Sequence, residues 1–199
     1  KAYEEPYFEA SDQKSEKILY KDTEQAFVYF GAPFKIKDLK HDLAKSKVMM
    51  FVLGGGFGSR LMEKIRVQEG LAYSVYIRSN FSKVAHFASG YLQTKLSTQA
   101  KSVALVKKIV KEFIEKGMTQ QELDDAKKFL LGSEPLRNET ISSRLNTTYN
   151  YFYLGLPLNF NQTLLDQIQK MSLKEINDFI KTHTEINDLR SEEHTSELQ

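Results

Sequence analysis

The segment of this chain with the greatest potential for chemistry is rich in glycine. It covers residues 52–75 and reads VLGGGFGSRLMEKIRVQEGLAYSV. Glycine clusters can cradle a phosphate, but no GxxxxGK[ST] pattern is present, and this cluster follows an expected helix where phosphate loops follow a strand. We therefore do not expect nucleotide binding. What the glycines offer is backbone that another chain can approach closely.

Histidine and cysteine give no sign of a metal site. The chain has no cysteine, which removes disulfides, thiolate metal sites and cysteine nucleophiles. Its histidines before the last ten residues, His41, His86 and His183, lie far apart, and none has a second histidine four residues away, as a helical zinc motif requires. We expect them to be surface or packed residues, and we expect this chain to bind no metal.

The composition is that of a soluble globular domain. Of 199 residues, 41% are hydrophobic and 27% are charged, and the length is enough to bury one substantial core. The longest apolar run, residues 48–53, is far shorter than the roughly 18–20 residues that span a bilayer, so we expect no transmembrane segment. The net charge is +2, and glutamates are interspersed with the lysines of residues 107–116, so we expect no nucleic-acid binding.

Both ends of the chain differ from its centre. Residues 1–22 are charged and contain Pro6, which is typical of an interdomain linker, and they show no signal-peptide pattern, so we expect a longer parent protein. Residues 190–199, RSEEHTSELQ, are identical to the translation of one frame of a common sequencing-library adapter, and we interpret them as an artefact. The predicted domain is therefore 23–189. Without the one arginine and three glutamates of the tail, its net charge rises from +2 to +4.

Hydrophobic periodicity predicts strands near the front of the chain and helices behind them. The expected strands are 25–30, 73–81 and 84–92, of which the last two form a hairpin. The expected helices are 38–53, 59–67, 98–116 and 141–152, and two more that begin at the S/T-x-x-E capping boxes of Thr119 and Ser172. This order indicates one α+β domain with an antiparallel sheet covered by helices.

The glycine-rich segment also carries the motifs of a known family. Residues 53–56, 59–61 and 70–73 read LGGG, SRL and GLAY. With Arg66 between them, they resemble the second, C-terminal domain of the insulinase or pitrilysin-like (M16) metallopeptidases, which include mitochondrial processing peptidases and bacterial two-domain subunits. The resemblance extends more weakly over almost the whole natural chain, through the helix start at residues 122–127 and the residues 131–133. It implies an α+β domain that is truncated here before its last strand, which would leave an exposed sheet edge.

The resemblance assigns roles to Arg66 and Tyr73, which lie seven positions apart. In the family, an arginine and a tyrosine at this spacing face the zinc centre of the N-terminal domain. Both side chains are hydrogen-bond donors, and donors aimed at a scissile carbonyl stabilise the oxyanion that develops when water attacks. Without the family, Arg66 would be a surface helix residue and Tyr73 the first core residue of a strand.

The resemblance also places a peptide-binding cavity beside the glycines. An extended peptide would add to a sheet edge there through main-chain hydrogen bonds. The residues expected to lie near this peptide are Gly54, Gly55, Gly56 and Ser59.

The implied parent protein encloses unstructured peptides and cleaves them with zinc. An N-terminal domain, paired with this one in cis, would hold zinc and the general base on an H-x-x-E-H motif that this chain lacks. We therefore expect zinc in the parent and an inactive fragment. The alternatives are a non-catalytic subunit that lends Arg66 and Tyr73 to a zinc-bearing partner, in a homo- or heterodimer, and a generic peptide-binding module. The compartment stays open between the bacterial cell envelope or periplasm and the cytoplasm.

Overall fold

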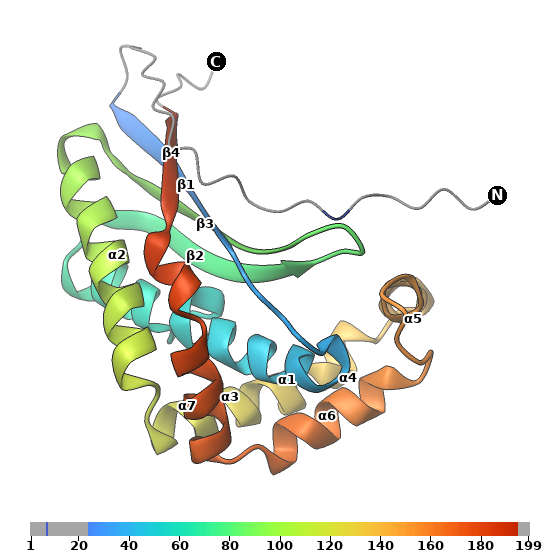
Figure 1. The fold of residues 1–199 in the computed structure, drawn as a ribbon. Helices are drawn as coiled ribbons and strands as arrows, with labels where there is room; N and C mark the ends of the chain where they lie inside the picture. The colour runs from blue at the N-terminus through green and yellow to red at the C-terminus, as the bar shows by residue number, and fades with distance from the viewer. Residues whose placement is uncertain (1–6, 8–23, 195–199) are drawn as a thin grey trace.

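One four-stranded antiparallel sheet forms one layer of the molecule (Figure 1). The computed structural model describes residue 7 and residues 24–194, so the expected linker, apart from residue 7, and the end of the tail lie outside the described residues. The strands run in the order β2-β3-β1-β4. Their bounds are Gln25–Pro33 for β1, Ala72–Phe81 for β2, His86–Lys95 for β3 and Arg190–His194 for β4.

Only one face of the sheet carries the core. Along β1, the side chains of Ala26, Val28, Phe30 and Ala32 are buried and alternate with more exposed neighbours, as in a strand that packs on one side. The helices gather on that side (Figure 1). The other face carries a row of tyrosine rings, and that of Tyr91 has its centroid 5.5 Å from that of Tyr29 and 5.6 Å from that of Tyr76.

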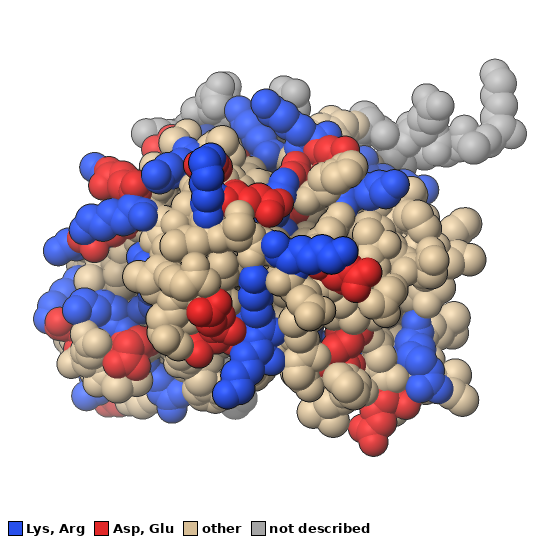
Figure 2. All heavy atoms as spheres, turned by 90° about the horizontal axis from the view of Figure 1, so that it is seen from below, with Lys and Arg blue, Asp and Glu red and all other residues tan. Residues whose placement is uncertain are grey.

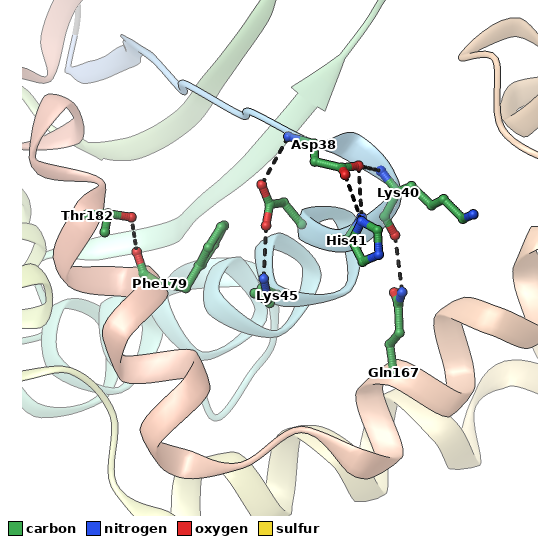
Figure 3. Close-up of polar contacts among 8 residues, drawn as sticks. Asp38, Lys40, His41, Lys45, Gln167, Phe179 and Thr182 are labelled. Carbon is green, nitrogen blue, oxygen red and sulfur yellow. Dashed lines mark hydrogen bonds and ion pairs between the residues drawn. The ribbon is translucent and has the colours of Figure 1, made fainter.

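The helical layer begins with α1, Leu39–Met50, which continues as a π-helical turn, η1, Phe51–Gly55. The Asp38 carboxylate caps α1 by accepting from the backbone N–H groups of Lys40 and His41 at 3.0 and 3.3 Å (Figure 3). The Gln167 side chain of α6, Phe160–Lys170, donates to the Lys40 carbonyl at 3.2 Å. The start of α1 is thus fixed both by its own cap and by a distant helix.

The other helices fill the rest of the layer. Their bounds are Met62–Gln68 for η2, Leu96–Thr98 for η3, Gln99–Lys116 for α2, Gln120–Gly132 for α3, Glu134–Arg137 for α4, Ile141–Tyr153 for α5, Leu173–Thr182 for α7 and Thr184–Asp188 for η4. The capping box at Thr119 is confirmed, because its hydroxyl accepts from Glu122 N–H and Glu122 in turn accepts from Thr119 N–H. Ser172 likewise caps α7.

The α+β class and the antiparallel sheet are confirmed, but one edge differs from expectation. We expected the sheet to lack its last strand and to leave an exposed edge. In the structure, residues 190–194 form β4 and pair with β1 from Phe27 to Gly31. Strand pairing uses backbone groups, so a polar segment such as the predicted artefact can occupy this edge.

The outer surface carries both signs of charge. Figure 2 shows lysine and arginine intermixed with aspartate and glutamate over the face seen from below. Among residues 7 and 24–194, no helix is both long enough and apolar enough to cross a membrane.

Gly117, at the end of α2, generates a prediction about stability. Its φ of 74° and ψ of −164° are open almost only to glycine, and a Cβ there would overlap the amide of Asn177, which bonds both backbone groups of Met118. Gly117→Ala should therefore lower the free energy of unfolding by about 1–3 kcal/mol. The measurement is urea denaturation.

Gly132 provides the control for that experiment. It lies at the end of α3, and no neighbouring group lies within 4 Å of the position that an added methyl group would take. Gly132→Ala should therefore leave stability unchanged or raise it by up to about 1 kcal/mol. Equal losses in the two variants would contradict the assigned role of Gly117.

Candidate functional site

Arg66 lies on a π-helix, a rare conformation that is often found at functional sites. Two backbone hydrogen bonds close the end of η2 with wider turns than an α-helix has. They run from Glu69 N–H to the Lys64 carbonyl at 3.1 Å and from Leu71 N–H to the Ile65 carbonyl at 2.9 Å. Ile65 is fully buried and anchors the helix, while Arg66 beside it is exposed. The local fold therefore presents the guanidinium to solvent.

Tyr73 lies on a β-bulge at the start of β2. Ala72 pairs with Thr94 and Ser74 pairs with Gln93, so Tyr73 is the extra residue between two consecutive partners. The Thr94 hydroxyl donates to the Leu71 carbonyl and fixes the chain just before the bulge. The side chain of Tyr73 is 55% exposed. The expectation from spacing alone, that Tyr73 is the first core residue of a strand, is therefore wrong, because the bulge turns its ring outward.

Tyr73 lines an open hollow of about 540 Å³ at this end of the sheet. The other residues that line it are Glu24, Gln25, Lys95, Leu96 and Ser97. Neither the Arg66 guanidinium nor the Tyr73 hydroxyl makes a hydrogen bond or ion pair with another described residue. Their donor groups are thus available to a ligand, and main-chain carbonyls are one class of acceptor that suits them.

The residues expected to contact a peptide divide into two groups. Gly54 is buried, and a methyl group there would lie 2.8–2.9 Å from atoms of Ile77 and Leu61, so its missing side chain serves packing against β2. Ser59 is 3% exposed, and its hydroxyl has no hydrogen-bond partner in the described part of the chain. Gly55 is exposed and Gly56 half-buried, so these two reach the surface, but Gly55 lines a different hollow from Tyr73, together with Phe51 and Phe129.

Arg60, which the sequence analysis did not single out, holds the glycine-rich segment to the helical layer. Its guanidinium donates to both carboxylate oxygens of Glu122, at 2.6 and 2.8 Å, and to the Gly117 carbonyl at 2.9 Å. It also lies 4.8 Å from the ring centroid of Phe113. In the sequence, Arg60 belongs to the Ser-Arg-Leu motif and Glu122 to the Thr119 capping box. The two residues are 62 positions apart, so no local pattern predicts that they pair.

The histidines stand apart in the structure as they do in the sequence. His41 contacts the Asp38 carboxylate at 2.7 Å, and buried His183 contacts Glu185 at 2.8 Å and packs on the Phe34 ring. Within residues 7 and 24–194, no three histidine, aspartate or glutamate side chains come together as a metal ion would require. The described residues therefore do not fit a zinc ion.

Comparison with known proteins identifies the family. The chain matches the family model of the peptidase M16 inactive domain over residues 1–130. The chain belongs to the peptidase M16 family. It is 96% identical, over 189 residues and 95% of its length, to a Helicobacter pylori protein named non-peptidase homolog YmxG. It is 32% identical, over 80% of its length, to a Mycobacterium tuberculosis protein named uncharacterized zinc protease Rv2782c.

A solved structure agrees with this assignment to M16. The crystal structure of a peptidase M16 inactive domain from Pseudomonas fluorescens superposes with a TM-score of 0.74 and 26% identity, over 86% of this chain and 40% of that chain. The M16 chain described here spans 44% of the Helicobacter pylori relative and 36% of the Mycobacterium tuberculosis relative. It is thus less than half the length of either protein.

The contact between Arg60 and Glu122 predicts an acid-dependent loss of stability. Burial raises the pKa of Glu122, but the hydrogen bonds from Arg60 and Thr119 outweigh it, so the pKa lies below its ordinary value of 4.5. A carboxylate with a lowered pKa stabilises the fold above the unfolded-state pKa, and this contribution is lost as the pH falls through the folded-state value. Glu122→Gln should cost about 1–3 kcal/mol at pH 7, measured by urea denaturation.

The pH dependence separates this contact from a general loss of packing. The stability gap between the unchanged chain and Glu122→Gln should shrink as the pH is lowered below 4.5, because the glutamate becomes neutral as well. Glu115→Gln, on the exposed side of α2, should show no such gap at either pH. A gap that stays constant from about pH 7 to about pH 3 would contradict the assignment.

Proposed function

We propose that this chain is the inactive-domain half of a non-peptidase M16 subunit. In this proposal the subunit holds an extended peptide against a zinc-bearing M16 partner, and Arg66 and Tyr73 donate hydrogen bonds to the peptide carbonyl. The 96% identity to a protein named non-peptidase homolog supports the first part. The family membership supports the pairing with another M16 domain.

The observation that carries the proposal is the exposure of two donors that the fold itself does not use. Arg66 projects from a π-helix and Tyr73 from a β-bulge, and neither the guanidinium nor the phenol hydroxyl is bonded to another described residue. The π-helix and the β-bulge are departures from a regular α-helix and a regular strand. Such deviations are over-represented beside active sites, where they aim a side chain.

The chemistry assigned to the pair is stabilisation of negative charge. The guanidinium offers several N–H donors that remain charged at any physiological pH, and the phenol offers one O–H donor. In an enclosed site, fixed donors bind an oxyanion more strongly than the neutral carbonyl from which it forms, and this difference accelerates the reaction. Gly55 and Gly56, which reach the surface, would let a peptide backbone pass close to the domain.

Zinc belongs to another domain in this proposal. The described residues do not fit the ion, so no step that uses it is assigned to this chain. The second candidate function is the C-terminal half of a zinc metalloendopeptidase whose own N-terminal domain holds the metal. The names of more distant relatives, such as the Mycobacterium tuberculosis zinc protease, favour this candidate.

Peptide hydrolysis distinguishes the two candidates. The full-length parent should be purified alone and together with a zinc-bearing M16 chain of the same organism, and cleavage of an unstructured fluorogenic peptide measured with and without a chelator. We expect no cleavage by the parent alone and chelator-sensitive cleavage by the pair. Chelator-sensitive cleavage by the parent alone would overturn the proposal in favour of the second candidate.

The roles of the two donors can be tested in the active assembly. Tyr73→Phe removes only the phenol O–H, and the loss of one oxyanion donor should lower kcat about 10²–10³-fold with little change in KM. Tyr76→Phe is the matched control, because Tyr76 is another exposed tyrosine of β2, outside the bulge. The control should keep full kcat.

Arg66→Leu should lower kcat by a similar factor, while Lys64→Leu on the same π-helix should not. Unchanged turnover in both Tyr73→Phe and Arg66→Leu would refute the donor role and leave a generic peptide-binding module.

A further inference from the structure

One helix of this domain presents its apolar side to solvent. Four residues of α5 share one side of the helix at spacings of four, four and three, and they are here called the α5 stripe: Ile141, Leu145, Tyr149 and Phe152. Their side chains are 77%, 65%, 60% and 66% exposed. The spacing of these residues predicts a helix, and that helix is confirmed. A periodic apolar side normally packs on the core, however, and this one does not.

The opposite side of α5 attaches it to the domain. Tyr151 is buried, its hydroxyl donates to the Asn161 side chain at 3.0 Å, and its ring meets that of Phe160 edge-on at 5.3 Å. Figure 1 shows α5 at an outer corner of the molecule, near the closed end of the β2–β3 hairpin. Among residues 7 and 24–194, the α5 stripe is therefore left exposed, and two further exposed leucines, Leu136 and Leu158, flank α5 in the sequence.

Exposed apolar surface of this extent marks an interaction site. The contrast with α2 supports this, because the outer side of α2 carries lysines and glutamates, which suit water. The sequence of α5 contains a single charged residue, Arg144. A helix that lies on a membrane surface carries several lysines or arginines beside its apolar side, so α5 fits a protein partner better than a lipid surface.

The position of Tyr7 bears on which protein segment could cover the α5 stripe. Tyr7, near the start of the chain, meets the His86 ring edge-on at 5.9 Å, at the closed end of the β2–β3 hairpin. Lys83, in the turn of the same hairpin, lies 5.2 Å from the ring centroid of Tyr153 at the end of α5. Tyr7, which precedes the first strand in the sequence, and the end of α5 therefore both lie beside the closed end of this hairpin.

We propose that the α5 stripe is the surface on which the upstream half of the full-length protein packs. The chain spans 44% of its 96% identical relative, so more than half of that polypeptide lies outside it and is available to cover the stripe. The inference rests on the proposed function only in taking this chain as the second half of a longer M16 protein. It does not depend on peptide binding by Arg66 and Tyr73.

Thiol labelling tests this proposal directly. The chain contains no cysteine, so Leu145→Cys introduces a single thiol in the α5 stripe, and Lys108→Cys introduces one on α2, where the lysine side chain is 71% exposed. Each variant is made in this chain and in the full-length relative, and the labelling rate of the peptide that carries the thiol is measured by mass spectrometry.

We expect Leu145→Cys to react at least about tenfold more slowly in the full-length protein than in the isolated chain. We expect Lys108→Cys to react at the same rate in both. Equal rates for Leu145→Cys would overturn the proposal. Slow labelling in the isolated chain that speeds up on dilution would also overturn it, because a second copy would then cover the stripe.

Thermal unfolding gives a second, independent measurement. Leu145→Asp should lower the Tm of the full-length protein by about 4 °C or more and leave the Tm of the isolated chain unchanged. Lys108→Asp should change neither. An equal drop in both proteins after Leu145→Asp would show that the stripe serves only this domain, and would refute the proposal. Neither experiment measures peptide turnover. A negative result here would therefore refute the role of the α5 stripe without refuting the proposed function.

Discussion

The position of the whole candidate site depends on one partly buried ion pair, that of Arg60 with Glu122. Arg60 comes from the glycine-rich segment and Glu122 from the first turn of α3, where it also completes the capping box of Thr119. The same guanidinium donates to the Gly117 carbonyl at the end of α2. One side chain thus joins two helix ends to the segment that leads into η2. A paired, bidentate contact of this kind fixes orientation as well as distance.

The irregular elements beyond this contact need such an anchor. A π-helix is an uncommon conformation, and a bulge interrupts the ladder of β2, so both depend on surrounding structure. Gly54 contributes to this surrounding structure, because only a residue without a side chain fits against Ile77. Leu61, Ile65 and Ile77 are buried in the core, whereas the two donors on the same segments, Arg66 and Tyr73, are exposed. A site that binds an oxyanion needs donors whose positions are set before the ligand arrives.

Much of the fold could be predicted from sequence, because local signals fix local structure. The cap at Asp38, the capping box at Thr119 and the periodicity of α2 each involve neighbours in the chain. The pairing of Arg60 with Glu122 could not be found this way, since it joins residues 62 positions apart. Nor could the burial of Ser59, or the exposure of Tyr73, which depends on how β2 aligns with β3. The apolar periodicity of α5 predicted a helix but not the direction in which its stripe would face.

The central claim is that Tyr73 faces a bound peptide in the assembled protein. It can be tested most directly by replacing Tyr73 with the photoreactive residue benzoyl-phenylalanine in the full-length parent, assembled with its zinc-bearing partner, and irradiating it with an unstructured peptide. The same residue at position 115, on the outer side of α2, serves as the reference. The account predicts a crosslink to the peptide from position 73 and none from position 115. Crosslinking that is absent from position 73, or equal at both positions, would contradict it.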